Sequence, residues 1–387
     1  MKIAIDCRYI LDPTNGQFGV ISEYIDGLAR ALFDLKTNVE FVLFFSDKYT
    51  GDLAVEKPRV RVIRVPSKKG NFFFNHFSFP KIVAGHKPDI FFSPHGQLPL
   101  GYRSRAIITV HDLAIYDHPE WFPGGFSRWF STKIVVPRSL CQAEKIIAVS
   151  EATKKDIIRL FGIDKGKIFV IYPAVNVPAV NKIINEEIRQ KFSLPEKYFL
   201  CLGTIEPRKN LSLAIRATKI LSDQSVDIHL VIAGKRGWKW QTTIEEIDKA
   251  NQDKKIVSEF GYVSLEEKFV LLAGATALVF PSSYEGFGLP PLEAMKIGIP
   301  VITTAVGSLS EVCGRVARYV SVDDPQELAR AMLEISCPQN SGDPTSLGLE
   351  GYGHRYSTDL VEQGFEQVVK FSWDKTAGAI IKILSEK

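Results

Sequence analysis

The segment Pro281–Gly298 constrains the fold of this chain more than any other stretch. It reads P-S-S-Y-E-G-F-G-L-P-P-L-E-A-M-K-I-G and follows the apolar run Thr276–Phe280, which is typical of a buried strand. A helix tolerates proline at its first position, so Pro290 or Pro291 predicts a helix start. Gly298 suits the left-handed residue that ends such a helix. The segment therefore predicts a buried strand, a glycine loop and a short helix, in this order.

Two carboxylates stand on either side of the glycine loop. Glu285 lies in the loop, and Glu293 is expected in the first helical turn, where a negative charge suits the helix dipole. Gly286 and Gly288 let the backbone approach a ligand, and free N–H groups at a helix N-terminus suit an anion or a polar sugar edge. We expect both carboxylates to point into one crevice. The alternative is a solvated loop acid followed by an ordinary helix acid.

The spacing of Glu285 and Glu293 resembles a known enzyme signature. With G-F-G-L-P-P-L between them, the two residues resemble the E-x7-E motif of glycosyltransferase family 4, whose members are retaining enzymes of the GT-B fold. The resemblance implies that Glu285 lies against the donor sugar and that Glu293 holds the ribose of the nucleotide. It also implies that the sugar and diphosphate meet the loop residues Gly286, Phe287, Gly288 and Leu289.

Length and composition indicate a two-domain globular protein. The chain has 387 residues, more than one hydrophobic core usually supports. Its net charge of +4 is compatible with an anionic substrate or an anionic membrane surface. Lysine and arginine are spread along the chain and form no dense stripe, so we expect no nucleic acid partner.

The cysteines and the apolar segments favour a cytoplasmic protein. Five cysteines at wide spacings form neither a disulfide framework nor a metal motif, which is typical of reducing cytosol. The start of the chain meets a charge too early for a secretory signal, and the run Phe269–Phe280 is too short to span a bilayer. Attachment to the cytoplasmic face of a membrane remains open.

Short apolar runs alternate with helical patterns along the whole chain, which favours parallel, doubly wound α/β sheets. The predicted strands of the first half are Lys2–Asp6, Glu40–Phe45, Val60–Val65, Asp89–Phe92, Ala106–His111, Lys145–Val149 and Lys167–Tyr172. Those of the second half are Tyr198–Gly203, Asp227–Ala233, Lys255–Phe260, Thr276–Phe280, Ile299–Thr303 and Ala317–Val320.

The resemblance implies a GT-B architecture, with two Rossmann-like domains facing across a cleft. Residues 1–176 are expected to form an N-terminal acceptor-binding domain and residues 177–365 a C-terminal domain that binds the nucleotide-sugar donor. Residues 366–387 are expected to form a helix that crosses back to the first domain. The proline-bounded segment Tyr172–Pro178 is predicted to be the linker.

Candidate site residues of the first half follow strands. Gly16 and Gly19, in the loop after the first strand, are candidates for cradling a phosphate or an acceptor, and an ordinary turn is the alternative. The resemblance places this loop near the donor diphosphate and the acceptor. His111, after the strand from Ala106, resembles the histidine that faces the donor sugar in family 4, and it is assigned a catalytic role. Asp112 and Tyr116 are assigned to the acceptor. The alternative is that His111 is a satisfied histidine and Asp112 caps the next turn.

The segment Ser67–Phe79 is unusually aromatic. It is expected to pack its phenylalanines on the sheet. The alternative is an acceptor groove or a patch facing an anionic membrane, with Lys68 and Lys69 meeting lipid head groups.

Two further donor-binding elements are predicted in the second half. Arg208 and Lys209 stand near the start of a helix from Leu211, where exposed N–H groups and two cations meet an oxyanion. Two adjacent cations repel one another, which favours diphosphate binding over a solvated pair. The resemblance adds Gly203 to this phosphate site. It also places the nucleotide base against the loop that contains Tyr262 and Val263.

No D-x-D pair in an apolar context stands out in the sequence, so we expect a metal-independent enzyme without a cofactor, and the resemblance implies a retaining hexosyltransferase. Cations on the diphosphate leaving group and orientation of the sugar supply the catalysis, and Glu285, His111, Arg208 and Lys209 are the expected catalytic residues. The resemblance is to mannosyltransferases, which makes GDP-mannose the first expected donor and a glycan or lipid-linked glycan the acceptor. A nucleotide-sugar 2-epimerase and a non-catalytic nucleotide-sugar binding protein remain the alternatives.

Overall fold

The structure is a computed structural model that describes residues 1–10, 19–66, 72–178, 186–336 and 356–386. It forms two compact units. Unit 1 comprises Met1–Val175 together with Phe371–Lys387, and unit 2 comprises Asn176–Lys370. The chain therefore leaves unit 1 within the proline-bounded segment and returns to it at its C-terminal end.

Unit 1 is built on a seven-stranded sheet in which every pair of neighbouring strands is parallel. The strand order is β3-β2-β1-β4-β5-β6-β7. The strands are β1 (Lys2–Asp6), β2 (Glu40–Ser46), β3 (Val60–Val65), β4 (Ile90–Ser93), β5 (Ala106–Val110), β6 (Lys145–Ala148) and β7 (Ile168–Val170).

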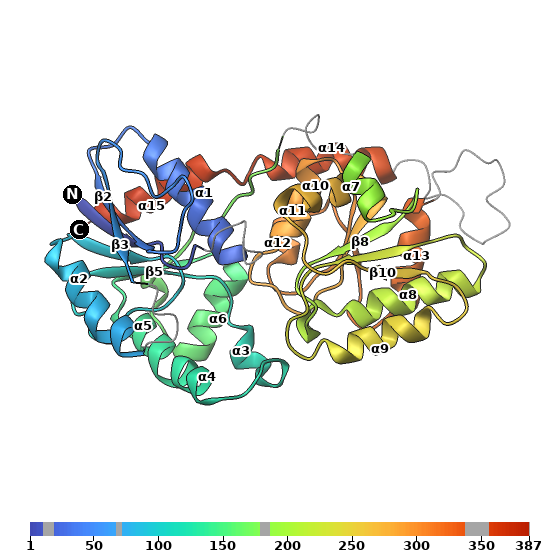
Figure 1. Ribbon diagram of the computed structural model, residues 1–387, viewed down its shortest axis with the longest axis horizontal. Helices are drawn as coiled ribbons and strands as arrows, with labels where there is room; N and C mark the ends of the chain where they lie inside the picture. Colours follow the sequence, from blue (N-terminus) through green and yellow to red (C-terminus); the bar gives the residue numbers. More distant parts are fainter. Residues whose placement is uncertain (11–18, 67–71, 179–185, 337–355, 387) are drawn as a thin grey trace. The chain divides into compact units, whose positions relative to one another are not determined.

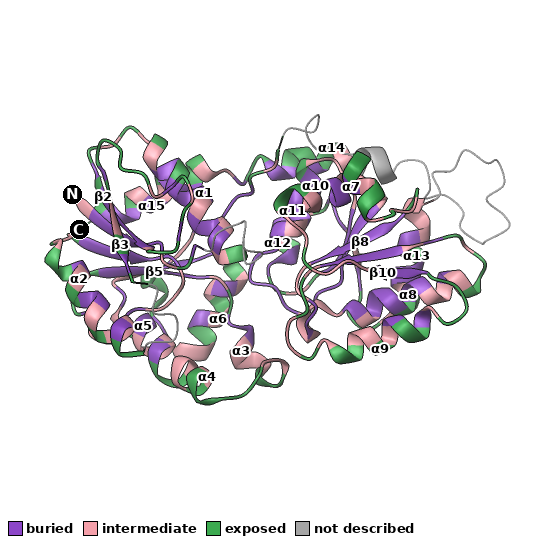
Figure 2. Cartoon of the chain, in the orientation of Figure 1, coloured by how far each residue is buried: buried purple, intermediate pink, exposed green. Residues whose placement is uncertain are grey.

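Helices cover both faces of this sheet, and the strands are buried between them (Figure 2). Alternate residues of β2 show why: Phe41, Leu43 and Phe45 enter one core, and Val42 and Phe44 enter the other. Figure 1 shows α1 and α15 on one side of the sheet and α5 and α6 on the other. The described helices of unit 1 are α1 (Val20–Asp34), α2 (Phe79–Gly85), α3 (Ala114–Asp117), α4 (Phe126–Phe130), α5 (Val136–Gln142), α6 (Glu151–Phe161) and α15 (Trp373–Ser385).

The last helix, α15, is an integral part of unit 1. Its Ala377 and Ile380 lie in the same core as α1. The Trp373 ring lies so close to Gly27 that a β-carbon there would come within 2.3 Å of it, so glycine allows the two helices to approach. The Thr376 hydroxyl also donates to the Tyr172 carbonyl at 2.6 Å. The last helix of the chain therefore completes the hydrophobic core of unit 1.

Unit 2 repeats the plan with six parallel strands in the order β10-β9-β8-β11-β12-β13. The strands are β8 (Phe199–Leu202), β9 (Leu230–Ala233), β10 (Val257–Glu259), β11 (Ala277–Phe280), β12 (Val301–Thr304) and β13 (Arg318–Val320). Figure 1 shows α8 and α9 on one side of this sheet and α10 and α11 on the other. The described helices of unit 2 are α7 (Glu186–Lys191), α8 (Leu211–Asp223), α9 (Gln241–Ala250), α10 (Leu265–Ala273), α11 (Leu289–Lys296), α12 (Leu309–Cys313), α13 (Pro325–Ser336) and α14 (Tyr356–Val368).

Each sheet has one point where the strand order reverses. In unit 1 it lies between β1 and β4, and in unit 2 between β8 and β11. Ligands of open α/β sheets bind in the crevice at the carboxyl ends of the strands at such a switch point. The fold therefore gives each unit one favoured place for a ligand.

The predicted strands and the parallel, doubly wound sheets are confirmed, since each described strand overlaps a predicted one. The start of α11 differs: the helix begins at Leu289, so Pro290 is its second residue. The aromatic segment is also only partly as expected. Phe74 and Phe79 are buried, but Phe72, Phe73 and Phe77 are 46%, 67% and 38% exposed. The expectation that these three rings pack on the sheet is therefore wrong.

Two expectations from the sequence fall outside the described residues, namely Gly16 and the lysine pair at 68 and 69. Within the described parts of the chain, no helix combines the length and apolar character that crossing a bilayer requires.

Candidate active site

The loops that follow β8 and β11 meet at the switch point of unit 2. Arg208 and Lys209 lie in a single 3-10 turn, Pro207–Lys209, which directly precedes α8. Glu285 lies in the loop between β11 and α11. The two loops are joined through their backbones, because the Ser283 N–H donates to the Arg208 carbonyl at 2.8 Å. The fold thus brings together side chains that are 77 positions apart in the sequence.

The Glu285 carboxylate is buried, 6% exposed, and it accepts three hydrogen bonds from side chains. Lys209 Nζ lies 2.5 Å and Ser282 Oγ 2.8 Å from Oε1, and Arg208 Nη1 lies 3.3 Å from Oε2. Such charge-assisted bonds are stronger than neutral ones. The alternative of a solvated loop acid at this position is therefore wrong.

A fourth charged residue, Glu206, completes this group, and its carboxylate accepts a hydrogen bond from Arg208 Nε. We call Glu206, Arg208, Lys209 and Glu285 the charge cluster. Two buried carboxylates pair with Arg208 and Lys209, so the alternative of a solvated basic pair is wrong, and repulsion between the cations is no longer an argument for a diphosphate. An incoming anion therefore competes with Glu206 and Glu285 for the same cations.

The pKa shifts of the two carboxylates run in opposite directions. Burial alone would raise the pKa of Glu285, but attraction to Lys209 and Arg208 outweighs it and holds the pKa below its ordinary value. Burial raises the pKa of Glu206, against the attraction of Arg208 and Lys209. Glu285 is therefore the carboxylate that stays ionised most firmly.

The glycine loop is held by the segment that precedes α12. Ser308 Oγ donates to the carbonyls of Glu285 and Phe287, at 3.1 and 2.6 Å. Gly307 has φ +55°, and a β-carbon there would lie 2.4 Å from the Glu285 carbonyl oxygen. Gly288, with φ +111°, is the left-handed residue before α11. Both glycines are therefore required by the backbone geometry of this loop.

Glu293 has a different partner and a different position from those expected. It lies in the second turn of α11, because the helix starts at Leu289, and the expectation of a first-turn acid is wrong. Its carboxylate is buried and accepts a hydrogen bond from Lys268 Nζ of α10 at 2.7 Å. Glu285 belongs to the charge cluster and stands before α11. Glu293 pairs with Lys268 and stands in the second turn of that helix.

The remaining predicted donor residues lie on neighbouring loops of unit 2. Gly203 follows β8 with φ +135°, and a β-carbon there would approach the Lys209 side chain at 3.3 Å. Tyr262 is 40% exposed, and Val263 directly precedes the capping residue of α10. Gly203 thus lies against the charge cluster, and Tyr262 and Val263 lie just before the helix that carries Lys268.

The predicted residues of unit 1 are mostly occupied by local contacts. His111 Nε2 donates to the Pro94 carbonyl at 2.7 Å, and burial lowers the pKa of His111 despite this bond. Asp112 accepts from the Ala114 N–H at 3.2 Å, and the Tyr116 hydroxyl donates to the Thr132 carbonyl at 2.8 Å. Gly19 caps the start of α1. These contacts are the ones that the structural alternatives predict, and the functional assignments stay predictions.

Four residues of the candidate site were missed from the sequence: Glu206, Lys268, Ser282 and Ser308. Ser282 and Glu206 carry a local signal, since they stand three residues before Glu285 and two residues before Arg208. Lys268 and Ser308 reach the site from separate elements, so their roles depend on tertiary structure.

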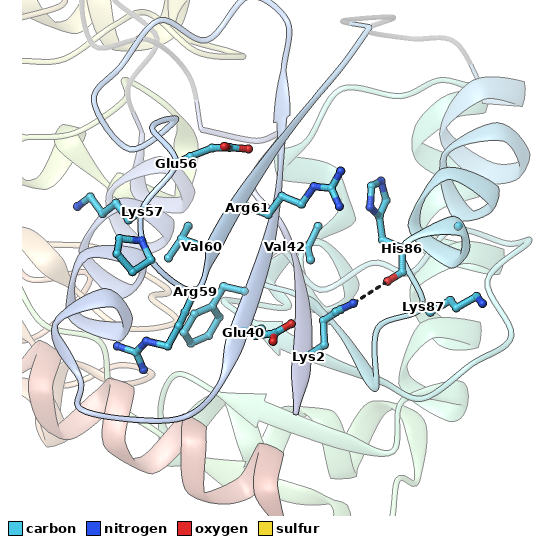
Figure 3. Close-up of a pocket in the computed structure, with 13 residues that line it drawn as sticks. Lys2, Glu40, Val42, Glu56, Lys57, Arg59, Val60, Arg61, His86 and Lys87 are labelled. Atoms are coloured by element: carbon cyan, nitrogen blue, oxygen red, sulfur yellow. Dashed lines mark hydrogen bonds between the residues drawn. The ribbon is translucent and has the colours of Figure 1, made fainter.

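A surface depression of unit 1 lies elsewhere (Figure 3). It is lined by Lys2, Glu40 and Val60, the first residues of three parallel strands, and by Arg61 and His86. Lys2 Nζ donates to the His86 carbonyl there, at 3.5 Å. The depression therefore lies at the amino ends of the strands, opposite to the end where ligands of such sheets bind.

Comparison with known proteins defines the class and then the family. A sucrose-phosphate synthase from Thermosynechococcus elongatus has the same fold, with a TM-score of 0.71, 19% identity and coverage of 99% of this chain and 98% of that chain. The two parallel α/β units are those of a GT-B glycosyltransferase. Residues 21–178 match the family described as Glycosyltransferase Family 4, and residues 184–340 match Glycosyl transferases group 1.

Two curated relatives are similar over much of the chain. O-antigen chain mannosyltransferase RfbU of Salmonella typhimurium is 32% identical over 269 residues, covering 70% of each chain. O-antigen chain mannosyltransferase B of Escherichia coli is 32% identical over 253 residues, which are 64% of this chain and 65% of that protein, slightly under two thirds of its length. The chain belongs to glycosyltransferase family 4.

Proposed function

We propose that this protein transfers a hexose, with retention of configuration, from a nucleoside-diphosphate sugar bound by unit 2 to a glycan or lipid-linked glycan. The observation that carries this proposal is the charge cluster at the β8/β11 switch point, directly before α8. Family membership supports sugar transfer. We assign the donor to residues 177–365 and the acceptor to residues 1–176.

Breaking the bond between sugar and diphosphate leaves negative charge on the diphosphate. Arg208 and Lys209 lie beside the N-terminus of α8, where backbone N–H groups and both cations meet such a leaving group. This positive field takes the place of a metal ion, and we predict that transfer persists in EDTA.

Glu285 acts by position and charge in this proposal. A buried carboxylate that accepts three hydrogen bonds and has a lowered pKa is a poor base and a poor nucleophile. It holds Lys209 and Arg208 until the donor arrives and then stabilises the positive charge that develops on the sugar. Glu293 binds the ribose hydroxyls, and Lys268 orients its carboxylate.

Mannose from GDP-mannose is the proposed donor group. It is supported by the names of the curated relatives, which are O-antigen chain mannosyltransferases. His111 is the residue of unit 1 that we assign to the sugar. With Nε2 donating to Pro94, the neutral ring presents Nδ1 as an acceptor.

Calorimetry with GDP, GDP-mannose, UDP and UDP-glucose tests the donor. The guanosine ligands are expected to bind, and Arg208→Ala is expected to weaken GDP by about 10–100-fold, since hydrogen bonds to charged groups are worth about 1.5–3 kcal/mol. The matched control is Arg216→Ala, which removes an exposed arginine of α8. Unchanged GDP affinity in Arg208→Ala would refute the proposed phosphate site.

Product analysis separates the enzyme classes. The protein is incubated with GDP-mannose alone and with mannose-terminated oligosaccharides, and the anomeric configuration of any product is read by proton NMR. A transferase gives an α-linked product only with an acceptor. An epimerase converts the donor without one, and a binding protein converts nothing.

We also infer that unit 1 touches an anionic membrane through an exposed group of rings. Phe72, Phe73, Phe77, Phe126, Trp129 and Phe130 form this aromatic patch, and Phe72 and Phe130 join its two segments with ring centroids 5.1 Å apart. Phe126 is 77% and Trp129 50% exposed. Residues 122–143 carry three cations and no acid, so an anionic lipid surface suits the patch in both polarity and charge.

Sedimentation with vesicles tests this contact. The protein is expected to pellet with phosphatidylcholine vesicles that contain about 30% phosphatidylglycerol and to stay in solution with pure phosphatidylcholine. Exchange of Phe126 and Trp129 to serine is expected to abolish pelleting, whereas Val55→Ser, at another exposed apolar residue of unit 1, leaves it unchanged. Equal pelleting of all three proteins would contradict the inference.

A further inference from the structure

A second buried charged group lies at the switch point of unit 1. Asp6 is the last residue of β1, and His95 follows β4 by two residues. Asp6 is 1% exposed, and its carboxylate accepts from Arg8 at 2.8 and 2.7 Å and from His95 Nε2 at 3.1 Å. These contacts bridge the two strands between which the strand order reverses. This is the place where an open α/β sheet favours a ligand.

The hydrogen bonds of His95 define its tautomer. Burial alone would raise the pKa of Asp6, but the charge of Arg8 and the bonds from Arg8 and His95 hold it well below its ordinary value. The ionised carboxylate only accepts, so His95 Nε2 carries a hydrogen. Ser93 Oγ gives its own hydrogen to the Gln97 carbonyl, and therefore it also accepts from Nε2. In the neutral ring, Nδ1 is thus the acceptor nitrogen.

The Nδ1 atom of His95 has no hydrogen-bond partner among the described residues, and it is not among their buried unpaired atoms. It therefore keeps a lone pair that no described residue uses. The side chain as a whole is only 5% exposed, so the ring is held firmly while one atom stays within reach.

An exposed aromatic ring lies over this histidine. The Tyr9 and His95 rings are in contact, with centroids 3.9 Å apart and planes tilted by 33°, and Tyr9 is 44% exposed. The Ser22 hydroxyl fixes the backbone beneath it by donating to the Tyr9 carbonyl at 3.2 Å. An aromatic face beside a fixed acceptor is the combination that a pyranose ring needs, because it has one apolar face and hydroxyl groups at its edge.

Arg8 holds the group from the other side. Its guanidinium lies 3.4 Å from the centre of the Phe79 ring and donates to Asn75 Oδ1 at 2.9 Å. A buried ion pair is weak evidence for stability, because apolar residues of similar volume often stabilise as well. Arg8 holds Asp6, and Asp6 in turn fixes the orientation of the His95 ring. A ring with a fixed orientation suits a role in ligand binding.

We propose that Tyr9 and His95 form a hexopyranoside subsite in unit 1 that binds a sugar ring of the acceptor. The sugar lies at the edge of the tilted Tyr9–His95 pair, where it packs against Tyr9 and one of its hydroxyl groups donates a hydrogen bond to His95 Nδ1. Asp6 and Arg8 are positioning residues that act through His95. The proposal rests on the proposed function, since it names residues that receive the acceptor, and it involves no residue of the charge cluster.

Saturation-transfer NMR on the full-length protein tests the subsite with methyl α-D-mannopyranoside, methyl α-D-glucopyranoside and methyl α-D-galactopyranoside, each with and without GDP. At least one glycoside is expected to receive saturation. Tyr9→Ala is expected to reduce it by about 3–10-fold, which corresponds to the loss of one aromatic contact. Tyr9→Phe keeps the ring and is expected to retain most of the signal.

Two substitutions of His95 separate binding from packing. His95→Gln keeps a donor toward Asp6 but loses the Nδ1 acceptor, and it is expected to raise the KM for the oligosaccharide acceptor by about 3–10-fold with little change in kcat. His95→Asn places an amide oxygen near the former Nδ1 position and is expected to recover part of this loss. His86→Gln, at the amino ends of the same strands, is the control and leaves KM unchanged.

GDP affinity, measured by calorimetry, separates this proposal from the proposed function. It is expected to remain unchanged in all Tyr9 and His95 variants. If GDP binds normally but no glycoside receives saturation, or if the signal is undiminished in Tyr9→Ala, the subsite is refuted while the donor site stands. If GDP fails to bind the unmodified protein, the proposed function fails first.

Discussion

At the scale of single residues, the charge cluster pairs two adjacent cations with two buried carboxylates. Glu206 and Glu285 hold Arg208 and Lys209 in place. Preorganised charges of this kind need little rearrangement when a ligand arrives. In the proposed function a diphosphate competes with these carboxylates for the same cations, and we expect this competition to set its affinity.

Replacement of Glu285 by glutamine tests the competition. Glu285→Gln removes a charge that competes with the diphosphate, and GDP is expected to bind about 3–10-fold more tightly, the value of one hydrogen bond of about 1 kcal/mol. Sugar transfer is expected to fall by about 100-fold or more, since the carboxylate no longer faces the developing positive charge. Calorimetry and initial rates measure the two effects. The control is Glu266→Gln, an exposed acid of α10. Weaker GDP binding in Glu285→Gln would mean that this carboxylate supports the diphosphate directly.

The buried carboxylate of Asp6 predicts a specific loss of stability in acid. Its folded pKa is lower than the ordinary value of 3.8, so ionised Asp6 stabilises the fold above about pH 4, and this stability is lost as pH falls toward the folded pKa. A tenfold difference in proton affinity between the folded and unfolded chain corresponds to about 1.4 kcal/mol. Between about pH 5 and pH 3, Asp6→Asn is therefore expected to lose about 1 kcal/mol less unfolding free energy than the unmodified protein. Urea unfolding monitored by circular dichroism measures the difference, and parallel losses in both proteins would contradict it.

At the scale of elements, the strands were predictable and the site was predictable only in part. A strand covered on both faces is a short apolar run, and β11, with the sequence Ala277–Phe280, is an example of that local signal. The position of Glu293 was missed because Gly288, with φ +111°, allows α11 to start at Leu289, before the prolines. The pairing of Arg208 with Glu285 was missed because Glu285 reaches it from the loop after another strand. Spacing therefore identified the residues, and only tertiary structure gave their pairing.

Gly307, in the loop before α12, is expected to be sensitive to substitution although glycine has no side chain. In Gly307→Ala, the new β-carbon would lie 2.4 Å from the Glu285 carbonyl oxygen, and φ is +55°. The loop must move, and we expect a loss of about 1–3 kcal/mol of unfolding free energy together with weaker GDP binding. Gly124→Ala, where nothing lies within 4 Å of the added carbon, is the control. Urea unfolding and GDP calorimetry measure both variants, and an unchanged Gly307→Ala protein would show that the loop adapts without cost.

At the scale of the whole molecule, the two units repeat one plan. Each has a parallel sheet with one reversal of strand order, and each places a buried carboxylate with an arginine at that reversal: Asp6 with Arg8, and Glu285 with Arg208. The plan itself follows from strand patterns in the sequence. The placement of α15 in unit 1 has no local signal, since its amphipathic pattern suits either sheet. It follows from the core that Ile380 enters with α1 and β1.

The integration of α15 predicts that a change at the end of the chain destabilises the first strands. Ile380 is fully buried in the unit 1 core, so Ile380→Ala is expected to cost about 2–5 kcal/mol. Hydrogen exchange measured by mass spectrometry should become faster in β1 and β2, while exchange in β8 and β11 and the affinity for GDP stay unchanged, because those strands belong to unit 2. The control is Lys382→Ala, which removes an exposed side chain of the same helix. Equal acceleration in the strands of both units would show that they unfold as one cooperative body, whereas acceleration confined to unit 1 fits a C-terminal helix that stabilises that unit alone.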